Sequence, residues 1–189
     1  YLVTGVQTCA LPISGSSWQP DEDLFIEYFN QHPEVKLVIA PHVIDENHLV
    51  EIIRKLKRPY VRYTRADEKN VRKADCLIID CFGLLSSIYR YGEIAYIGGG
   101  FGVGIHNTLE AAVYGIPVIF GPKYQKFQEA IQLLEAKGAF SVKDYEELKT
   151  LLDRMLTDEV FLRESGMNAS NYVTGNAGAT DKIMSMINF

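Results

Sequence analysis

Short β-rich runs alternate with helical patterns along almost the whole chain, and this alternation limits the fold more than any other feature. The expected strands are rich in Val and Ile and cover residues 35–41, 60–64, 75–80, 94–100, 116–122 and 139–142. Apolar residues at helical spacing predict helices within residues 17–32, 45–57, 82–92, 107–115, 124–138, 144–158 and 159–175, and a last helix over about 177–187. This order predicts an α/β fold with a doubly wound parallel sheet, covered by helices on both faces.

The residues that follow the expected strands are the first candidates for a ligand site. In doubly wound sheets, ligands bind beyond the carboxyl ends of the strands. Four segments stand at such ends: Pro41–His42, residues 80–82, the glycine loop at residues 98–104, and Gly121–Pro122. Because parallel strands end at one edge of the sheet, we expect these four segments to converge on one cleft.

Composition excludes several classes of protein. The formal net charge of −5 and the absence of a basic run argue against a nucleic-acid partner. Three cysteines (Cys9, Cys76 and Cys81) are too few and too irregular for a disulfide scaffold or a zinc site. No run reaches the roughly 18 apolar residues of a membrane span, and we expect no metal and no cofactor.

The first fourteen residues differ in character from the rest of the chain. The segment Val3–Ser14 resembles the translated sequence of a common sequencing-library adapter, and a native strand and turn is the alternative. We therefore expect residues 1–14 to be non-native and residues 15–189 to be the native domain, cut from a longer protein. If the foreign segment replaces a native strand, one position in the sheet should be poorly filled.

The stretch "GGGFGVGIHNTLE" (residues 98–110) carries the strongest sign of function. Its glycines would let the backbone approach an anion, and the following helix start offers free N–H groups. Asn107 is placed to cap that helix or to bind a ligand. Glu110 could accept hydrogen bonds from ribose hydroxyls or simply favour the helix N-terminus. His106 has no Cys or acidic residue at metal-binding spacing, which favours contact with an anion or a sugar. A tight turn without a ligand is the alternative.

Several well-known nucleotide motifs do not fit this loop. The fingerprint G-x-G-x-x-G fails in each register, because its third glycine position holds Val103, Ile105 or Asn107. The loop also lies late in the chain, whereas the fingerprint belongs to the first strand-to-helix turn. A P-loop and a G-x-S-x-G nucleophile elbow are absent.

The segment 98–130 resembles the C-terminal, donor-binding domain of GT-B glycosyltransferases, and more narrowly the bacterial 3-deoxy-D-manno-octulosonic acid (Kdo) transferases. The resemblance rests on residues 99–100, 104–110 and 117–122, and it extends to "GSSW" at residues 15–18 and "IAPH" at residues 39–42. The chain departs from the family pattern at Leu84, Ile105, Thr108 and Lys126. Retaining GT-B enzymes often have two glutamates eight residues apart, but Gly102 stands eight before Glu110, which fits an inverting enzyme.

The resemblance implies transfer of Kdo from CMP-Kdo to a lipid A precursor at the cytoplasmic face of the bacterial inner membrane. Phosphate would bind N–H groups near Gly104, His106 and Asn107, ribose would bind Glu110, and cytosine would lie near residues 41–42 and 82–83. The general base and the membrane contact would belong to the missing N-terminal part, so this fragment alone should be inactive. The donor-binding residues implied by the resemblance are Pro41, His42, Phe82, Gly83, Gly99, Gly100, Gly104, His106, Asn107, Glu110 and Lys126.

Two other functions remain open from the sequence. A GT-B enzyme or an epimerase-like enzyme that uses a UDP-sugar would share the logic of this loop. A non-catalytic α/β module that binds nucleotides is the second alternative. Among the remaining polar residues, we expect His32 and His48 to be solvated and the acidic run at residues 21–23 to be an ordinary helix N-terminus.

Overall fold

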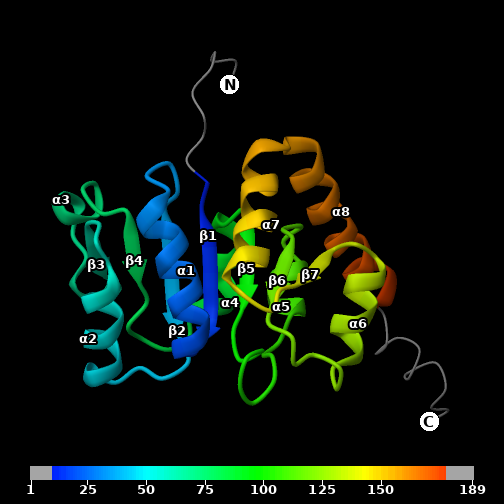
Figure 1. The fold of residues 1–189 in the computed structure, drawn as a ribbon, viewed down its shortest axis with the longest axis horizontal. Coiled ribbons are helices and arrows are strands. Elements are labelled where there is room, and N and C mark those ends of the chain that lie inside the picture. Colours follow the sequence, from blue (N-terminus) through cyan, green and yellow to red (C-terminus); the bar gives the residue numbers. More distant parts are fainter. Residues whose placement is uncertain (1–9, 178–189) are drawn as a thin grey trace, which may run out of the picture.

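The computed structural model describes residues 10–177 and has one seven-stranded sheet in which all neighbouring strands are parallel. The strand order is β3-β4-β2-β1-β5-β6-β7 (Figure 1). This arrangement confirms the predicted doubly wound α/β fold. The strand bounds are β1 Pro12–Ser17, β2 Leu37–Pro41, β3 Tyr60–Arg62, β4 Cys76–Ile78, β5 Ile94–Ile97, β6 Val118–Phe120 and β7 Ala139–Ser141.

Helices cover both faces of this sheet because the inner strands bury side chains on both sides. In β2, Leu37 and Ile39 pack into one core cluster, whereas Val38 and Ala40 pack into the other. The first cluster includes residues of α1, α2 and α7, and the second includes residues of α5, α6 and α8. The helix bounds are α1 Gln19–Gln31, α2 Glu46–Lys55, α3 Glu68–Val71, α4 Leu85–Ile88, α5 Leu109–Ala112, α6 Gln128–Glu135, α7 Tyr145–Thr157 and α8 Glu159–Asn176.

Strand β1 occupies the middle of the sheet and crosses the boundary expected between residues 14 and 15. Ile13 pairs with Val38 of β2 on one side and with Ala95 of β5 on the other, and it is buried. The central position is therefore filled, although the hydroxyl of Ser14 is buried without a hydrogen-bond partner among the described residues. The folded unit thus uses residues from before Gly15, and the adapter origin of residues 1–14 stays a prediction.

Several helices are shorter than their sequence patterns predict. The helix expected over residues 82–92 is α4, followed by a 3-10 turn at Tyr89–Tyr91 that ends at Gly92. Helix α6 begins at Gln128 because residues 124–127 form a turn instead. Helix α8 continues through Gly175 and ends at Asn176. Most of the helix expected over residues 177–187 lies outside the described residues.

Two glycines hold the carboxyl ends of β5 and β6 close together. A Cβ atom on Gly100 would lie 2.6 Å from the backbone N and Cα of Gly121. We expect Gly100→Ala to lower the free energy of unfolding by about 1–3 kcal/mol, because backbone must move to admit the methyl group. Gly102→Ala is the matched control, since its Cβ would lie 3.9 Å from the nearest heavy atom. Equal denaturation midpoints for the two variants would contradict this close-packing account.

Candidate functional site

Three aromatic rings meet at the carboxyl edge of the sheet, where the chain leaves β1, β2 and β5. His42 stacks on Trp18 with a centroid distance of 4.7 Å and on His106 with a centroid distance of 4.4 Å. The indole Nε1–H of Trp18 donates a hydrogen bond of 3.3 Å to His106 Nε2. The structure therefore brings together His42 and His106, two residues predicted for one site, and adds Trp18, which sequence reasoning missed.

Asp21 ties the start of α1 to the glycine loop. Its carboxylate accepts hydrogen bonds from the backbone N–H of Trp18 (2.9 Å), the backbone N–H of Gly99 (2.9 Å) and the hydroxyl of Tyr96 (2.6 Å). Asp21 and its neighbour Glu22 are each only 1% exposed. The predicted acidic helix N-terminus is confirmed, because both residues lie in the first turn of α1, and their burial adds contacts that the charge pattern did not predict. Pro20 in the first turn, one residue before Asp21, marks the start of the helix but gives no sign of burial.

The glycine loop is folded back on itself by its own backbone. The N–H groups of Gly102 and Gly104 both donate to Gly99 O at 3.0 Å, and His106 N–H donates to Gly98 O at 3.2 Å. The N–H groups of Gly104 and His106, expected to face a phosphate, are thus already engaged. Among the described residues, the N–H groups of Asn107 and Thr108 donate no hydrogen bond. These two donors stand at the start of α5, where backbone N–H groups can hold an anion. Figure 1 shows the loop at the lower edge of the sheet.

Gly99 and Gly100 allow backbone segments to pack closely against each other. Gly99 has a φ of +93°, and a Cβ atom there would lie 2.3 Å from Gly104 O. Gly100 packs against Gly121 as described above. These glycines shape the loop, and their predicted approach to an anion is not visible in the loop itself.

Asn107 and Glu110 are joined at the start of α5. Asn107 Oδ1 accepts the N–H of Leu109 at 3.0 Å, and Asn107 Nδ2 donates to Glu110 Oε1 at 3.1 Å. Asn107 therefore caps the helix start, one of the two roles predicted for it. The half-buried Glu110 keeps its second carboxylate oxygen free of hydrogen bonds within the described part of the chain. This oxygen is available to a hydroxyl group.

A pocket of about 210 Å³ lies between the ends of β2 and β4. The side chains and backbone of Pro41, His42, Phe82 and Gly83 line it, together with Ser16 and Cys81 among others. All four residues predicted to surround cytosine are thus found around one cavity. Phe82 is 81% exposed, so its ring is free to cover a planar group.

Asp80 anchors the turn that forms this pocket. Its side chain is fully buried and accepts hydrogen bonds from Arg62 Nε (2.8 Å), Thr64 N–H (2.8 Å) and the Thr64 hydroxyl (2.6 Å). Burial raises the pKa of this carboxyl, but the hydrogen bonds from Thr64 and Arg62 outweigh it and hold the pKa below its usual value. Asp80 is therefore a carboxylate that fixes the backbone just before Phe82.

Lys126 lies away from the contacts that join the other predicted residues. It is exposed in the turn before α6, and its ammonium group has no hydrogen bond or ion pair among the described residues. Lys123 instead donates from Nζ to Gly102 O at 3.0 Å, so Lys123 is the lysine that touches the glycine loop. The predicted role of Lys126 stays untested by this arrangement.

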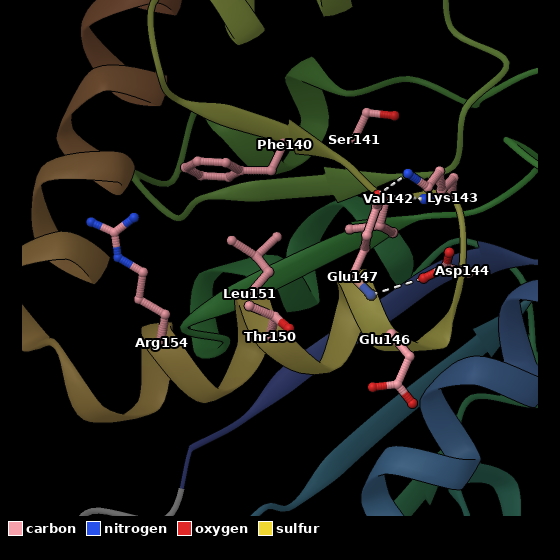
Figure 2. Close-up of a pocket in the computed structure, with 10 residues that line it drawn as sticks. All are labelled: Phe140, Ser141, Val142, Lys143, Asp144, Glu146, Glu147, Thr150, Leu151 and Arg154. Carbon is pink, nitrogen blue, oxygen red and sulfur yellow. Dashed lines mark hydrogen bonds and ion pairs between the residues drawn. The ribbon is translucent and has the colours of Figure 1, made fainter.

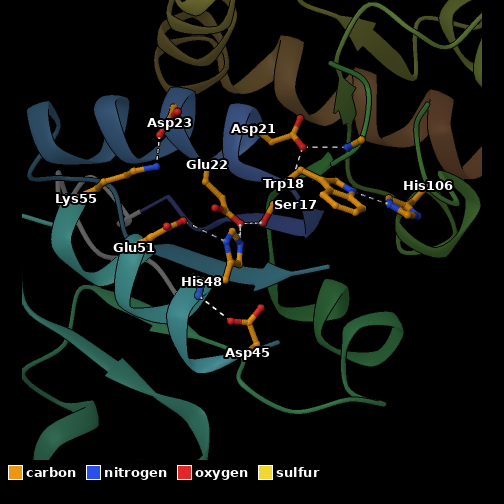
Figure 3. A network of polar contacts seen from close by, with 11 residues as sticks. Ser17, Trp18, Asp21, Glu22, Asp23, Asp45, His48, Glu51, Lys55 and His106 are labelled. Atoms are coloured by element: carbon orange, nitrogen blue, oxygen red, sulfur yellow. Dashed lines mark hydrogen bonds and ion pairs between the residues drawn. The ribbon is translucent and has the colours of Figure 1, made fainter. Parts of the chain in front are cut away.

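A second polar network continues from the site into the space between α1 and α2 (Figure 3). Glu22 Oε1 accepts hydrogen bonds from Ser17 Oγ at 3.0 Å and from His48 Nε2 at 2.9 Å. His48 is 14% exposed and His32 is 18% exposed, so both histidines are largely buried and the expectation of solvated rings is wrong. Burial raises the pKa of Glu22, while His48 and Ser17 oppose that rise.

A larger pocket, of about 580 Å³, lies between β7 and α7 (Figure 2). Its walls include Phe140, Val142, Thr150 and Leu151, and none of the predicted site residues lines it. Near it, Lys143 pairs with Glu147, and the Arg154 guanidinium lies 3.6 Å from the centre of the Phe161 ring. It therefore adds no group to the site at the carboxyl edge.

Among residues 10–177, no group of three or more His, Cys, Asp or Glu side chains is placed to hold a metal ion. None of the described helices combines the length and the apolar character that a membrane span needs.

The chain has the fold of the C-terminal domains of GT-B glycosyltransferases. A solved structure, the C-terminal CMP-Kdo binding domain of WaaA from Acinetobacter baumannii, superposes with a TM-score of 0.75 at 18% identity and covers 88% of this chain and 90% of that domain. This likeness establishes the fold. No family model matches the chain.

Sequence relatives point to one kind of GT-B enzyme. The chain is 32% identical over 151 residues to 3-deoxy-D-manno-octulosonic acid transferase of Aquifex aeolicus (strain VF5), which covers 77% of this chain and 41% of that protein. The transferase of the same name from Chlamydia muridarum (strain MoPn / Nigg) is 28% identical over 155 residues, covering 79% and 35%. The resemblance to Kdo transferases is confirmed, and the chain spans less than half the length of these relatives.

Proposed function

We propose that this chain is the donor-binding domain of a Kdo transferase and that it binds CMP-Kdo. The observation that carries the proposal is the placing of the pocket at residues 41–42 and 82–83 beside His106 and Glu110, at one edge of the sheet. The relatives named Kdo transferase, and the CMP-Kdo binding domain with the same fold, support it.

In the proposed complex, each part of CMP meets one group of residues. Cytosine enters the pocket between His42 and the exposed ring of Phe82, and Glu110 accepts hydrogen bonds from ribose hydroxyls. The phosphate receives hydrogen bonds from His106 and from the free N–H groups of Asn107 and Thr108. These donors stabilise the negative charge that develops on CMP as the bond to Kdo breaks, which is electrostatic stabilisation of the transition state.

The full-length protein would move Kdo to a lipid A precursor with inversion at the anomeric carbon. That reaction needs a general base at the acceptor hydroxyl, and we propose that the base lies in an N-terminal domain outside this chain. The same part would contact the cytoplasmic face of the inner membrane. The isolated chain is therefore expected to bind the donor weakly and to transfer no sugar.

We expect the 189-residue chain to bind CMP with a dissociation constant near 1 mM, about −4 kcal/mol, because in our proposal an N-terminal domain outside this chain forms the other side of the cleft. Calorimetric or NMR titration with CMP, UMP and UDP measures this affinity and its base preference. His106→Ala and Glu110→Ala should each weaken CMP binding, whereas Glu135→Ala removes an exposed carboxylate on α6 and should leave it unchanged.

Each outcome of the titration has a defined meaning. Selective binding of CMP that is lost in the two site variants supports the proposal. A preference for UDP would move the chain to a UDP-sugar enzyme with the same fold. A well-folded chain that binds none of the three nucleotides would refute the donor-binding role.

A further inference from the structure

The hydrogen bond between Trp18 and His106 determines where the proton of the histidine ring lies. The indole Nε1–H of Trp18 can only donate, and it points to His106 Nε2 at 3.3 Å. Nε2 must then be the acceptor, so it carries no hydrogen. A neutral His106 ring therefore has its hydrogen on Nδ1, which makes no hydrogen bond to another described residue. The arrangement leaves one donor on the ring free.

The surroundings of His106 favour this neutral ring. The titratable groups that face it are His42 at the end of β2, Asp21 on α1 and Glu110 on α5. Burial lowers the pKa of His106, and the neighbouring His42 lowers it further, while the two carboxylates act in the opposite direction with less effect. Together these effects hold the pKa of His106 below its usual value, which favours the neutral ring.

Trp18 is held in a fixed position relative to the glycine loop by Asp21. Its backbone N–H and the N–H of Gly99 donate to the same oxygen, Asp21 Oδ2, each at 2.9 Å. Its ring also stacks on His42 with an interplanar angle of 25°. Because the backbone and the ring of Trp18 are both fixed, the direction of its indole N–H toward His106 is fixed as well (Figure 3).

We propose that Trp18 is a positioning residue that holds His106 in the neutral Nδ1–H form, so that Nδ1 donates a hydrogen bond to the phosphate of the bound nucleotide. This proposal rests on the proposed function for its ligand. Its first half, the state of the ring, concerns the free protein and does not depend on any nucleotide.

The test is to measure the tautomer of His106 by ¹⁵N NMR of the side chain in the free 189-residue chain, with His106→Gln to assign the signal. We expect the Nδ1–H form in the unaltered chain. Trp18→Phe keeps an aromatic ring against His42 but removes the donor, and we expect it to raise the pKa of His106 and to populate the Nε2–H form. An Nε2–H ring in the unaltered chain overturns the proposal, whether or not Trp18→Phe folds.

The second arm of the test compares CMP with cytidine, which lacks the phosphate. Trp18→Phe should weaken CMP binding about 2- to 10-fold, the effect of one neutral hydrogen bond, and should leave cytidine binding unchanged. An equal loss for both ligands would show that Trp18 only supports packing and would overturn the positioning role. If the ring is Nδ1–H but CMP does not bind, the proposed function fails while the assignment of the ring stands.

Discussion

Asp21→Ala is expected to lower the free energy of unfolding by about 3–5 kcal/mol, as measured by denaturant unfolding. The substitution removes one carboxylate that accepts three hydrogen bonds, from Trp18 N–H, Gly99 N–H and the Tyr96 hydroxyl. Asp21 and Tyr96 are buried, so the donors lose their partner where water cannot replace it easily. Gly99 stands at the start of the glycine loop, so the same change should also weaken nucleotide binding.

Asp21→Asn should lower the free energy of unfolding much less than Asp21→Ala does, because an amide can satisfy the three donors that contact Asp21. Trp18 and Gly99 both donate to Oδ2, which the amide oxygen can replace. Tyr96 donates to Oδ1, and its hydroxyl can turn to accept a hydrogen bond from the amide NH₂ instead. We expect a loss of about 1–2 kcal/mol, from charge-assisted bonds that become neutral ones.

The nearby Asp23 provides the control for both Asp21 variants. It lies in the same turn, but its side chain is 49% exposed and pairs with Lys55. Asp23→Ala should change stability by no more than about 1 kcal/mol, as is usual for a surface ion pair. An Asp21→Ala variant as stable as Asp23→Ala would contradict the role of Asp21 as the buried link to the loop.

The sheet could be predicted from the sequence because its strands are buried in the core and are therefore visible as apolar runs. Leu37 and Ile39 face one helical layer while Val38 and Ala40 face the other, and a strand buried on both sides must be a continuous apolar run. The same reasoning placed His42 and His106 at one edge, because each follows a strand of a parallel sheet. These two predictions needed only local pattern and the geometry of the fold.

The roles of Trp18 and Asp21 could not be predicted in the same way. Residues 12–17 have no clear strand pattern, and their overlap with the adapter-like segment hid the central strand that leads to Trp18. An acidic residue in the first turn of a helix is normally solvated, and only the approach of Gly99 and Tyr96 from distant strands buries Asp21. One signal was available in the sequence. Ligands bind beyond the carboxyl ends of parallel strands, so a strand ending within "GSSW" would have placed Trp18 at the site.

At the other end of the site, the Asn variant should not be milder than the Ala variant, as it is at Asp21. We expect Asp80→Asn to lower the free energy of unfolding nearly as much as Asp80→Ala. Asp80 Oδ1 accepts the N–H of Thr64, while Oδ2 accepts Arg62 Nε–H and the Thr64 hydroxyl. Two of these donors, a backbone N–H and a guanidinium, cannot become acceptors. An amide NH₂ would face one of them in either orientation, so we expect each variant to lose about 3–5 kcal/mol of unfolding free energy.

The effect of Asp80 should also depend on pH in a defined direction. Its pKa in the folded chain lies below the ordinary value of 3.8, because hydrogen bonds from Thr64 and Arg62 outweigh burial. The unfolded chain therefore takes up the proton first as the pH falls, and the stability given by the carboxylate is present above about pH 4 and lost below it. Unfolding measured at pH 7 and at pH 3 should show a smaller difference between the unaltered chain and Asp80→Asn at the lower pH.

Asp75 is the matched control for Asp80. It stands directly before β4, at the opposite edge of the sheet, whereas Asp80 follows the end of β4. The Asp75 side chain is 31% exposed and pairs with Arg58 Nη2 at 3.3 Å, so Asp75→Asn should cost no more than about 1 kcal/mol. Only the Asp80 variants should also weaken CMP binding, since Cys81, Phe82 and Gly83 follow Asp80 directly and line the proposed cytosine pocket. If Asp80→Asn lost stability but bound CMP as tightly as the unaltered chain, the base would have to lie elsewhere along the edge.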